Sequence, residues 1–177
     1  MIATGAAPPI STARPRWTIN LRHDYRRPNA PPLPAPMIRG RVEADDKFLY
    51  NAYLLNYRKN HPMTWVPHGL YFKPQAEVFT WLLKHADVRI ACFPEDAWTI
   101  LGFIVYGRQS ESFVLHYIYV RERGRGVGTR LLRSAMAGER LIVATHMCDD
   151  YEQLRTKVHP ARVVYDPYLL PRLMHAP

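Results

Sequence analysis

The chain has 177 residues, of which 47% are hydrophobic and 22% are charged, and its formal net charge is +9. This length and composition are typical of one soluble globular domain with an appendage. No apolar run approaches the roughly 18 residues of a membrane span, and the first residues lack the pattern of a secretory signal, so we expect an intracellular, cytoplasmic protein without a membrane partner.

The basic excess is concentrated at the start of the chain. Residues 1–42 hold seven arginines and one acid, Asp24, and they also hold eight of the sixteen prolines. Proline removes backbone donors and favours extended geometry. We therefore predict an extended basic arm over residues 1–42 and a folded domain over 43–177. The arm is either a tether to an acidic partner, such as nucleic acid or a protein assembly, or a solvated tail.

Hydrophobic spacing predicts two helices at the start of the domain. The first covers 45–60, with Asp45 or Asp46 as its cap, and the second covers 74–85, with Pro74 in its first turn. Five β-rich runs bounded by turn residues predict strands over 88–92, 97–106, 113–120, 141–147 and 162–165.

Two further helices separate the last three strands. The first is predicted over 127–136, with Gly138 as its C-cap, and the second is a short helix that ends near Lys157. Both cysteines, Cys92 and Cys148, lie in apolar stretches, where we expect them to be buried and unpaired.

The sharpest local pattern is the segment 113–132, in which an apolar strand runs into a glycine-rich turn and then into an amphipathic helix. Backbone N–H groups at a helix N-terminus have no partner within the helix, and the helix dipole adds partial positive charge, so such a turn binds a pyrophosphate. Glycines at 124, 126 and 128 allow close approach, and four arginines surround the turn: Arg121, Arg123, Arg125 and Arg130.

The turn sequence Arg123-Gly124-Arg125-Gly126-Val127-Gly128 resembles the signature of GNAT (GCN5-related N-acetyltransferase) proteins, and the order of elements from about Val42 to Tyr165 is similar to theirs. The resemblance implies an α/β (α+β) domain with a mixed central sheet of about six strands flanked by helices. It also implies transfer of an acetyl or other acyl group from acetyl-CoA to the amine of an unidentified acceptor. The expected coenzyme contacts are Ile118, Tyr119, Val120, Arg123, Gly124, Arg125, Gly126, Val127, Gly128 and Thr129.

The sequence departs from the family pattern in two places. Only two residues separate Val120 from Arg123, so either the turn is shortened or Ile118 is the equivalent strand residue; 118 and 120 share a face in both cases. After Met147, the Asn and the Gly-Phe of many family members are missing. These departures favour an alternative function, in which a catalytically silent protein of this fold acts as a structural or binding module, for example in a phage particle.

Direct transfer to an amine needs a base, a group that polarises the carbonyl, and an acid. Strict alternation places Ser112, Val114, His116 and Ile118 on one face of their strand, and His116 is the only titratable residue among them, so it is the first candidate for the base, with Glu111 in reserve. The alternative is a structural histidine. The resemblance implies that a backbone N–H near the family's bulge, which falls around 118–120 here, polarises the carbonyl.

The resemblance implies Tyr151 as the acid that protonates the leaving thiolate, with Tyr165 as an alternative, while packing is the competing role of either ring. Cys148 as an acyl carrier is a remote option. Residues 61–72, with Trp65, His68 and Tyr71, are expected on the acceptor side.

Other phosphate-binding and metal-binding classes fit poorly. A dinucleotide-binding turn requires a third glycine where Thr129 stands, and no Gly-Lys-Ser/Thr follows the turn as in a phosphate-binding loop. The eight histidines are scattered without paired ligand spacing, so no metal site is expected.

Overall fold

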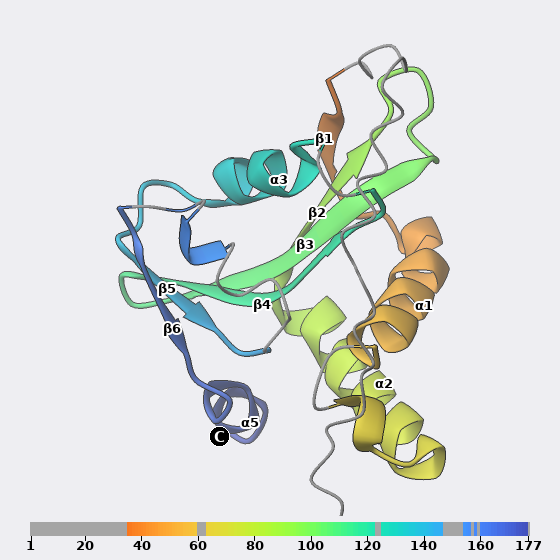
Figure 1. Ribbon diagram of the computed structural model, residues 1–177, viewed down its shortest axis with the longest axis vertical. Coiled ribbons are helices and arrows are strands. Elements are labelled where there is room, and N and C mark those ends of the chain that lie inside the picture. The colour runs from red at the N-terminus through yellow and green to blue at the C-terminus, as the bar shows by residue number, and fades with distance from the viewer. Residues whose placement is uncertain are drawn as a thin grey trace, which may run out of the picture.

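The computed structural model describes residues 35–59, 63–122, 125–146, 154–156, 158 and 160–176. Six strands form one sheet in the order β1-β2-β3-β4-β5-β6 (Figure 1). The strands are β1 Met37–Gly40, β2 Asp87–Cys92, β3 Ile100–Gln109, β4 Ser112–Val120, β5 Leu141–Ala144 and β6 Arg162–Tyr165. Pairing is antiparallel from β1 to β4 and parallel from β4 to β6, so the expected mixed sheet is confirmed.

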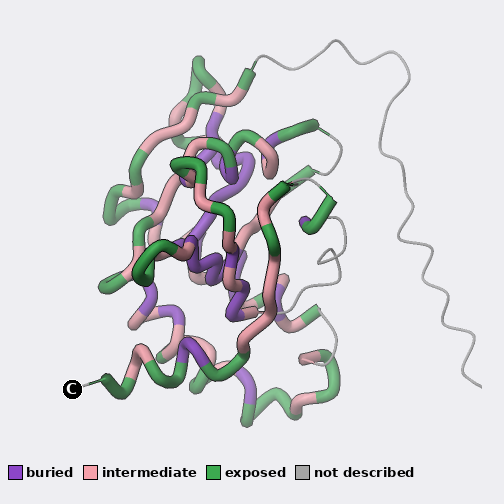
Figure 2. Tube along the Cα trace, turned by 90° about the vertical axis from the view of Figure 1, so that its left-hand side faces the viewer, coloured by how far each residue is buried: buried purple, intermediate pink, exposed green. Residues whose placement is uncertain are grey.

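Helices cover both faces of this sheet. They are α1 Asp46–Tyr57, α2 His68–His85, α3 Val127–Ala135 and α5 Leu169–Met174, with short 3-10 turns η1 Glu43–Asp45 and η2 Met63–Trp65. One buried cluster joins α1, α2 and α5 to the sheet, and a second joins α3 to its other face. Buried residues therefore run through the middle of the molecule, between two exposed layers (Figure 2). None of the helices described is long and apolar enough to cross a bilayer.

The second helix begins at His68, well before the predicted start, and Pro74 lies inside it. The prediction was wrong because tertiary contacts hold the first turns in helical geometry. Tyr71 is 1% exposed, and its hydroxyl donates a 2.9 Å hydrogen bond to the carbonyl oxygen of Leu54 in α1. Packing against α1 thus offsets the backbone hydrogen bond that proline removes.

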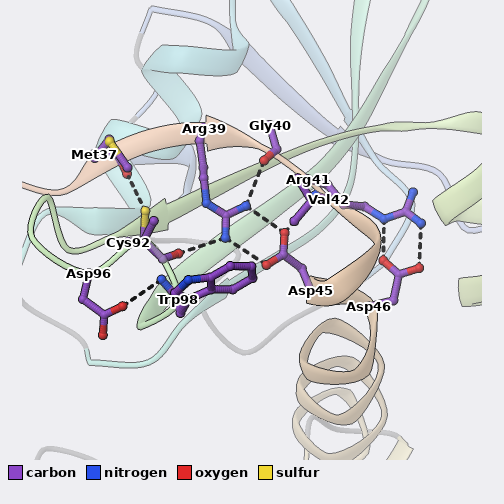
Figure 3. A network of polar contacts seen from close by, with 11 residues as sticks. Met37, Arg39, Gly40, Arg41, Val42, Asp45, Asp46, Cys92, Asp96 and Trp98 are labelled. Atoms are coloured by element: carbon purple, nitrogen blue, oxygen red, sulfur yellow. Dashed lines mark hydrogen bonds and ion pairs between the residues drawn. The ribbon is translucent and has the colours of Figure 1, made fainter.

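β1 lies within the predicted arm, and two arginines of that arm tie it to the start of α1 (Figure 3). Arg39 donates to both carboxylate oxygens of Asp45, at 2.7 and 2.8 Å, and Arg41 pairs with Asp46. Asp45 is the N-cap residue, but its side chain binds Arg39 and the Val42 N–H instead of capping the helix. The division of the chain at residue 42 stays a prediction.

Several predicted boundaries differ from those of the structure. The strand expected from 97 begins at Ile100, because Asp96 accepts hydrogen bonds from the Trp98 N–H and the Thr99 hydroxyl and holds a turn there. The strand expected over 141–147 ends at Ala144. The C-cap of α3 is Met136, whereas Gly138, at φ +97°, lies in the following loop.

One strand and one helix of the structure, β1 and α5, were not predicted, and neither were the 3-10 turns η1 and η2. The expected short helix before Lys157 falls largely outside the described residues, although 154–156 are helical. Cys92 is buried and free, as expected, and Cys148 lies outside the described residues.

Candidate functional site

β4 carries a β-bulge at His116. Val105 of β3 pairs with Tyr117, whereas the next residue, Tyr106, pairs with Leu115, so His116 is an extra residue in β4. A bulge of this kind interrupts the regular alternation of side chains. It lies earlier in the strand than the predicted position around 118–120.

The bulge changes which side chains share a face. Before it, Phe113 and Leu115 belong to the buried cluster on the α3 side; after it, Ile118 and Val120 pack against that cluster, whereas Tyr117 belongs to the cluster on the α1 side. The prediction that Ile118 shares a face with Ser112 and Val114 is therefore wrong, because alternation was assumed to be unbroken. The prediction that residues 118 and 120 share a face is confirmed.

Beyond Leu115, no strand among the residues that the structure describes pairs with the outer edge of β4, and we call this part of β4 its open edge. β5 pairs with β4 only from Phe113 to Leu115, and beyond that point the Thr145 N–H donates a last hydrogen bond, 3.0 Å, to the Leu115 carbonyl. The Arg121 N–H points toward β3, where it bonds to Leu101. Because backbone groups alternate along an antiparallel pair, those of Ile118 and Val120 point away from β3, toward the edge that β5 leaves open.

The turn after β4 leads directly into the N-terminus of α3. Gly126 is the N-cap residue at φ +72° and ψ 2°, a left-handed conformation that favours glycine, and its carbonyl accepts from the Arg130 N–H at 3.0 Å. A Cβ atom at Gly126 would meet nothing within 4 Å. The N–H groups of Val127, Gly128 and Thr129, which have no partner within the helix, thus follow a turn whose N-cap residue carries no side chain.

The start of α3 packs closely on the end of β4. A Cβ atom at Gly128 would be 3.3 Å from Cγ2 of Val120 and 3.9 Å from Cδ1 of Ile118. The open backbone edge and the helix N-terminus are therefore next to each other, and one extended ligand can contact both.

Positive charge surrounds the turn, with one compensating acid. Arg121, Arg125 and Arg130 are exposed, and Arg125 forms a 2.8 Å ion pair with Glu122. Arg123 and Gly124, both predicted contacts, lie outside the described residues. Along the described part of the chain, no group of three or more His, Cys, Asp or Glu residues could hold a metal ion.

A chain of hydrogen bonds begins at the bulge, on the α1 side of the sheet. Nδ1 of His116 lies 3.1 Å from Oγ1 of Thr145, which lies 3.0 Å from Nδ1 of His146. Nε2 of His146 lies 3.0 Å from the hydroxyl of Tyr53, which donates to Oε1 of Gln75 at 2.7 Å. These hydrogen bonds thus connect five side chains, which come from β4, from the residues after β5, from α1 and from α2.

The two histidines of this hydrogen-bonded network, His116 and His146, are neutral at pH 7. His116 is only 3% exposed, and burial lowers its pKa to about 4. Burial, and after it the charge of His116, lowers the pKa of His146 to about 3. His146 keeps some exposed surface, but its imidazole ring is bordered by the rings of Tyr53, Tyr57 and Tyr117.

The other predicted catalytic residues lie elsewhere or are not described. Tyr151 lies outside the described residues. Glu111 is exposed in the turn before β4, at the far end of the strand from the open edge. Tyr165 pairs with Ala144 at the end of β6, and burial raises its pKa.

The expected acceptor side is described from Met63 onward. Trp65 is 75% exposed, and His68 lies against Phe72 with 4.3 Å between ring centroids. Arg58 extends over the rings of Tyr71 and Phe72, at 5.5 and 5.4 Å from their centroids.

Sequence reasoning missed four residues of the hydrogen-bonded chain: Tyr53, Gln75, Thr145 and His146. One signal was available for Thr145 and His146, because polar residues that follow a strand parallel to β4 lie at the same end of the sheet as the open edge. Nothing in the pattern of α1 separates Tyr53 from an ordinary core aromatic.

No protein-family model and no curated protein matches the chain. Solved structures do match. A putative acetyltransferase from Pyrococcus furiosus is 19% identical over 73% of this chain and 95% of its own, with a TM-score of 0.50. An acetyltransferase from Corynebacterium glutamicum is 17% identical over 59% of this chain and 71% of its own, with a TM-score of 0.47. A PaiA N-acetyltransferase from Thermoplasma acidophilum, solved in complex with coenzyme A, is 15% identical over 58% of this chain and 70% of its own, with a TM-score of 0.43.

Proposed function

Because the chain has the GNAT acyltransferase fold, we propose that it transfers an acetyl or longer acyl group from coenzyme A to the amine of an acceptor. One observation carries the proposal: the open edge of β4 leads through a left-handed glycine, Gly126, into the uncapped N-terminus of α3. This arrangement offers backbone hydrogen bonds to an extended ligand. Next to them, it offers the positive end of the α3 helix dipole to a pyrophosphate.

Each part of a coenzyme has matching groups in this arrangement. The outward backbone groups of Ile118 and Val120 suit the amides of the pantetheine arm. The N–H groups of Val127, Gly128 and Thr129 suit the pyrophosphate, and the absence of a side chain at Gly126 leaves space for it. The arginines around the turn supply positive charge without a dedicated metal ion.

The bulge supplies the chemical end of the proposed site. Acyl-coenzyme A brings a thioester, which an amine attacks once it has lost its proton. His116 lies where β4 and β5 separate, and it is the proposed base, acting directly or through water. A backbone N–H of β4 freed by the separation polarises the thioester carbonyl in this scheme. Tyr151 remains the proposed acid.

A catalytically silent protein of the same fold is the second candidate. The burial of His116 favours it, because an imidazole that is 3% exposed, with a pKa of about 4, is a weak base for an ammonium group. In that case the anion-binding turn would hold a coenzyme or another phosphate without transfer.

Calorimetric titration with acetyl-CoA tests the coenzyme site before any acceptor is known. The informative variant is Gly126→Asp, which places a carboxylate in the proposed pyrophosphate position, and the matched control is Gly126→Asn. Both residues tolerate a left-handed backbone better than most and have the same shape, so the two variants differ mainly in charge.

We expect micromolar binding by the native chain, a loss of at least about tenfold in affinity for Gly126→Asp, and a much smaller loss for Gly126→Asn. Binding that is equal in the two variants would contradict the proposed location. If the folded native chain does not bind acetyl-CoA at all, the proposed transfer reaction is wrong.

A further inference from the structure

The hydrogen-bonded chain from His116 to Gln75 has a defined direction. Oε1 of Gln75 only accepts, so the hydroxyl hydrogen of Tyr53 points toward Gln75. The Tyr53 oxygen is then an acceptor for His146, whose Nε2 must carry a hydrogen. A neutral imidazole has one N–H, so Nδ1 of His146 is an acceptor.

The same reasoning continues to the bulge. Because Nδ1 of His146 accepts, the hydroxyl of Thr145 donates to it, and the Thr145 oxygen is left to accept from His116. Nδ1 of His116 therefore carries the hydrogen, and Nε2 carries the lone pair. The state of a buried histidine is fixed in this way by the bond that its other nitrogen makes.

We propose that Thr145, His146, Tyr53 and Gln75 are positioning residues that hold His116 in the Nδ1–H form, so that its Nε2 accepts the proton of the acceptor amine. This inference rests on the proposed function. In the step, the N–H bond of the ammonium breaks and an N–H bond forms at Nε2. His116 becomes an imidazolium that still donates from Nδ1 to Thr145, and it later releases the proton to water.

The surroundings of His116 agree with this assignment. Nε2 of His116 faces Gly107 of β3, where a Cβ atom would lie 3.5 Å from it, so at this position a glycine and not a larger residue lies against the basic nitrogen. Thr145 is 6% exposed, and His116 is 3% exposed, so water competes little for the hydrogen bond between them. A polar network in which every member has a partner fixes one arrangement of its hydrogens.

The direct test is nuclear magnetic resonance of the histidine ring nitrogens in the full native chain at pH 7, without an acyl donor. Long-range proton–nitrogen correlations distinguish the two neutral forms of each ring. We expect His116 as the Nδ1–H form and His146 as the Nε2–H form. Finding His116 as the Nε2–H form, or as an average of both forms, would overturn the inference. This measurement needs no activity, so it stands or fails independently of the proposed function.

A matched pair of variants tests the positioning role. Thr145→Val keeps the side-chain shape but removes the hydroxyl, and Thr145→Ser keeps the hydroxyl. We expect Thr145→Val to release His116 into a mixture of both forms and to lower kcat about tenfold or more, with KM for acetyl-CoA within twofold of native. Thr145→Ser should restore the Nδ1–H form and most of kcat.

An unchanged His116 in folded Thr145→Val would show that Thr145 does not position it. If Thr145→Val does not fold, Tyr53→Phe interrupts the hydrogen-bonded network at its other end. It should also leave His146 in a mixture of its two neutral forms. If no amine is acetylated by the native chain, only the proposed function fails, because the nitrogen signals still report the state of His116.

Discussion

The carbonyl oxygen of Tyr119 lies so close to Gly102 that a Cβ atom added to Gly102 would be 2.5 Å from it. The same Cβ would lie 3.2 Å from Cγ1 of Val127 and 3.3 Å from Cδ1 of Leu131. β3 therefore runs beside the end of β4 and passes directly beneath the start of α3. A glycine on the neighbouring strand thus sets how closely the two halves of the proposed coenzyme site approach.

This packing predicts that Gly102→Ala destabilises the protein. The nearest atom belongs to the backbone, so relief requires a movement of β4, and we expect a loss of about 2 kcal/mol or more in the free energy of unfolding. Denaturant unfolding measures it. Gly40→Ala is the control, because nothing lies within 4 Å of a Cβ there. Equal stability of the two variants would mean that β4 adapts freely.

The sequence predicted well those elements that depend on local pattern. α3 and β4 have nearly the expected bounds, because glycines and arginines separate a run of apolar residues from a helix with a single buried stripe. A bulge was expected in this strand, but its position at His116 could not be predicted, since no residue type distinguishes it and the position depends on the register with β3. One extra residue then reversed the face of Ile118.

Other elements depend on contacts between distant segments. β1 has only four residues and follows a proline-rich stretch, so it becomes a strand through pairing with β2 and through the ion pairs of Arg39 and Arg41. The hydrogen-bonded chain depends on Tyr53 and His146, which are far apart in sequence and meet only in the folded protein.

The Arg39–Asp45 pair should contribute strongly to stability. Asp45 is 3% exposed, so Asp45→Ala would leave the guanidinium of Arg39 without its main acceptor, at a cost of about 3 kcal/mol. Asp46→Ala is the comparison: the side chains of Arg41 and Asp46 are 28% and 27% exposed, and we expect a loss of about 1 kcal/mol. Urea unfolding at pH 7 separates the two, and a smaller effect at Asp45 than at Asp46 would contradict this ranking.

The same pair predicts a dependence on pH in the acid range. The hydrogen bond from Arg39 holds the pKa of Asp45 below its ordinary value. The stabilisation is therefore fully present above the unfolded pKa of about 3.9 and is lost as pH falls through the lower, folded pKa. The stability difference between the native chain and Asp45→Ala should shrink below about pH 4. A difference that stays constant down to pH 2 would contradict this.

Pro74→Ala should stabilise the protein. Pro74 is exposed inside α2 and lacks the N–H that would bond to the carbonyl of Leu70, so alanine restores a helical hydrogen bond. Loss of the rigid ring in the unfolded chain offsets part of the gain, and we expect a net increase of about 1 to 2 kcal/mol. Lys73→Ala, at an exposed neighbouring position, should change little. Thermal unfolding provides the measurement, and a lower midpoint for Pro74→Ala would show that α2 needs the proline.

Protonation of His116 and His146 should destabilise the fold below neutral pH. Burial lowers the folded pKa of these groups to about 4 and about 3, while an unfolded histidine titrates near 6.5. The unfolded chain thus binds more protons in this window, so this contribution to stability is fully present above about pH 6.5 and is lost as the pH drops toward the folded pKa values.

Each such histidine lowers the free energy of unfolding by about 2 kcal/mol between pH 7 and pH 5. Among the described residues, Thr145, Tyr53, Tyr57 and Tyr117 contact the two rings, and none of these four supplies a negative charge at these pH values. Urea unfolding at pH 7, 6 and 5 measures the slope, with His146→Gln expected to flatten it. A native slope that is no steeper than that of His146→Gln would mean that His146 does not titrate between the folded and unfolded states in this range.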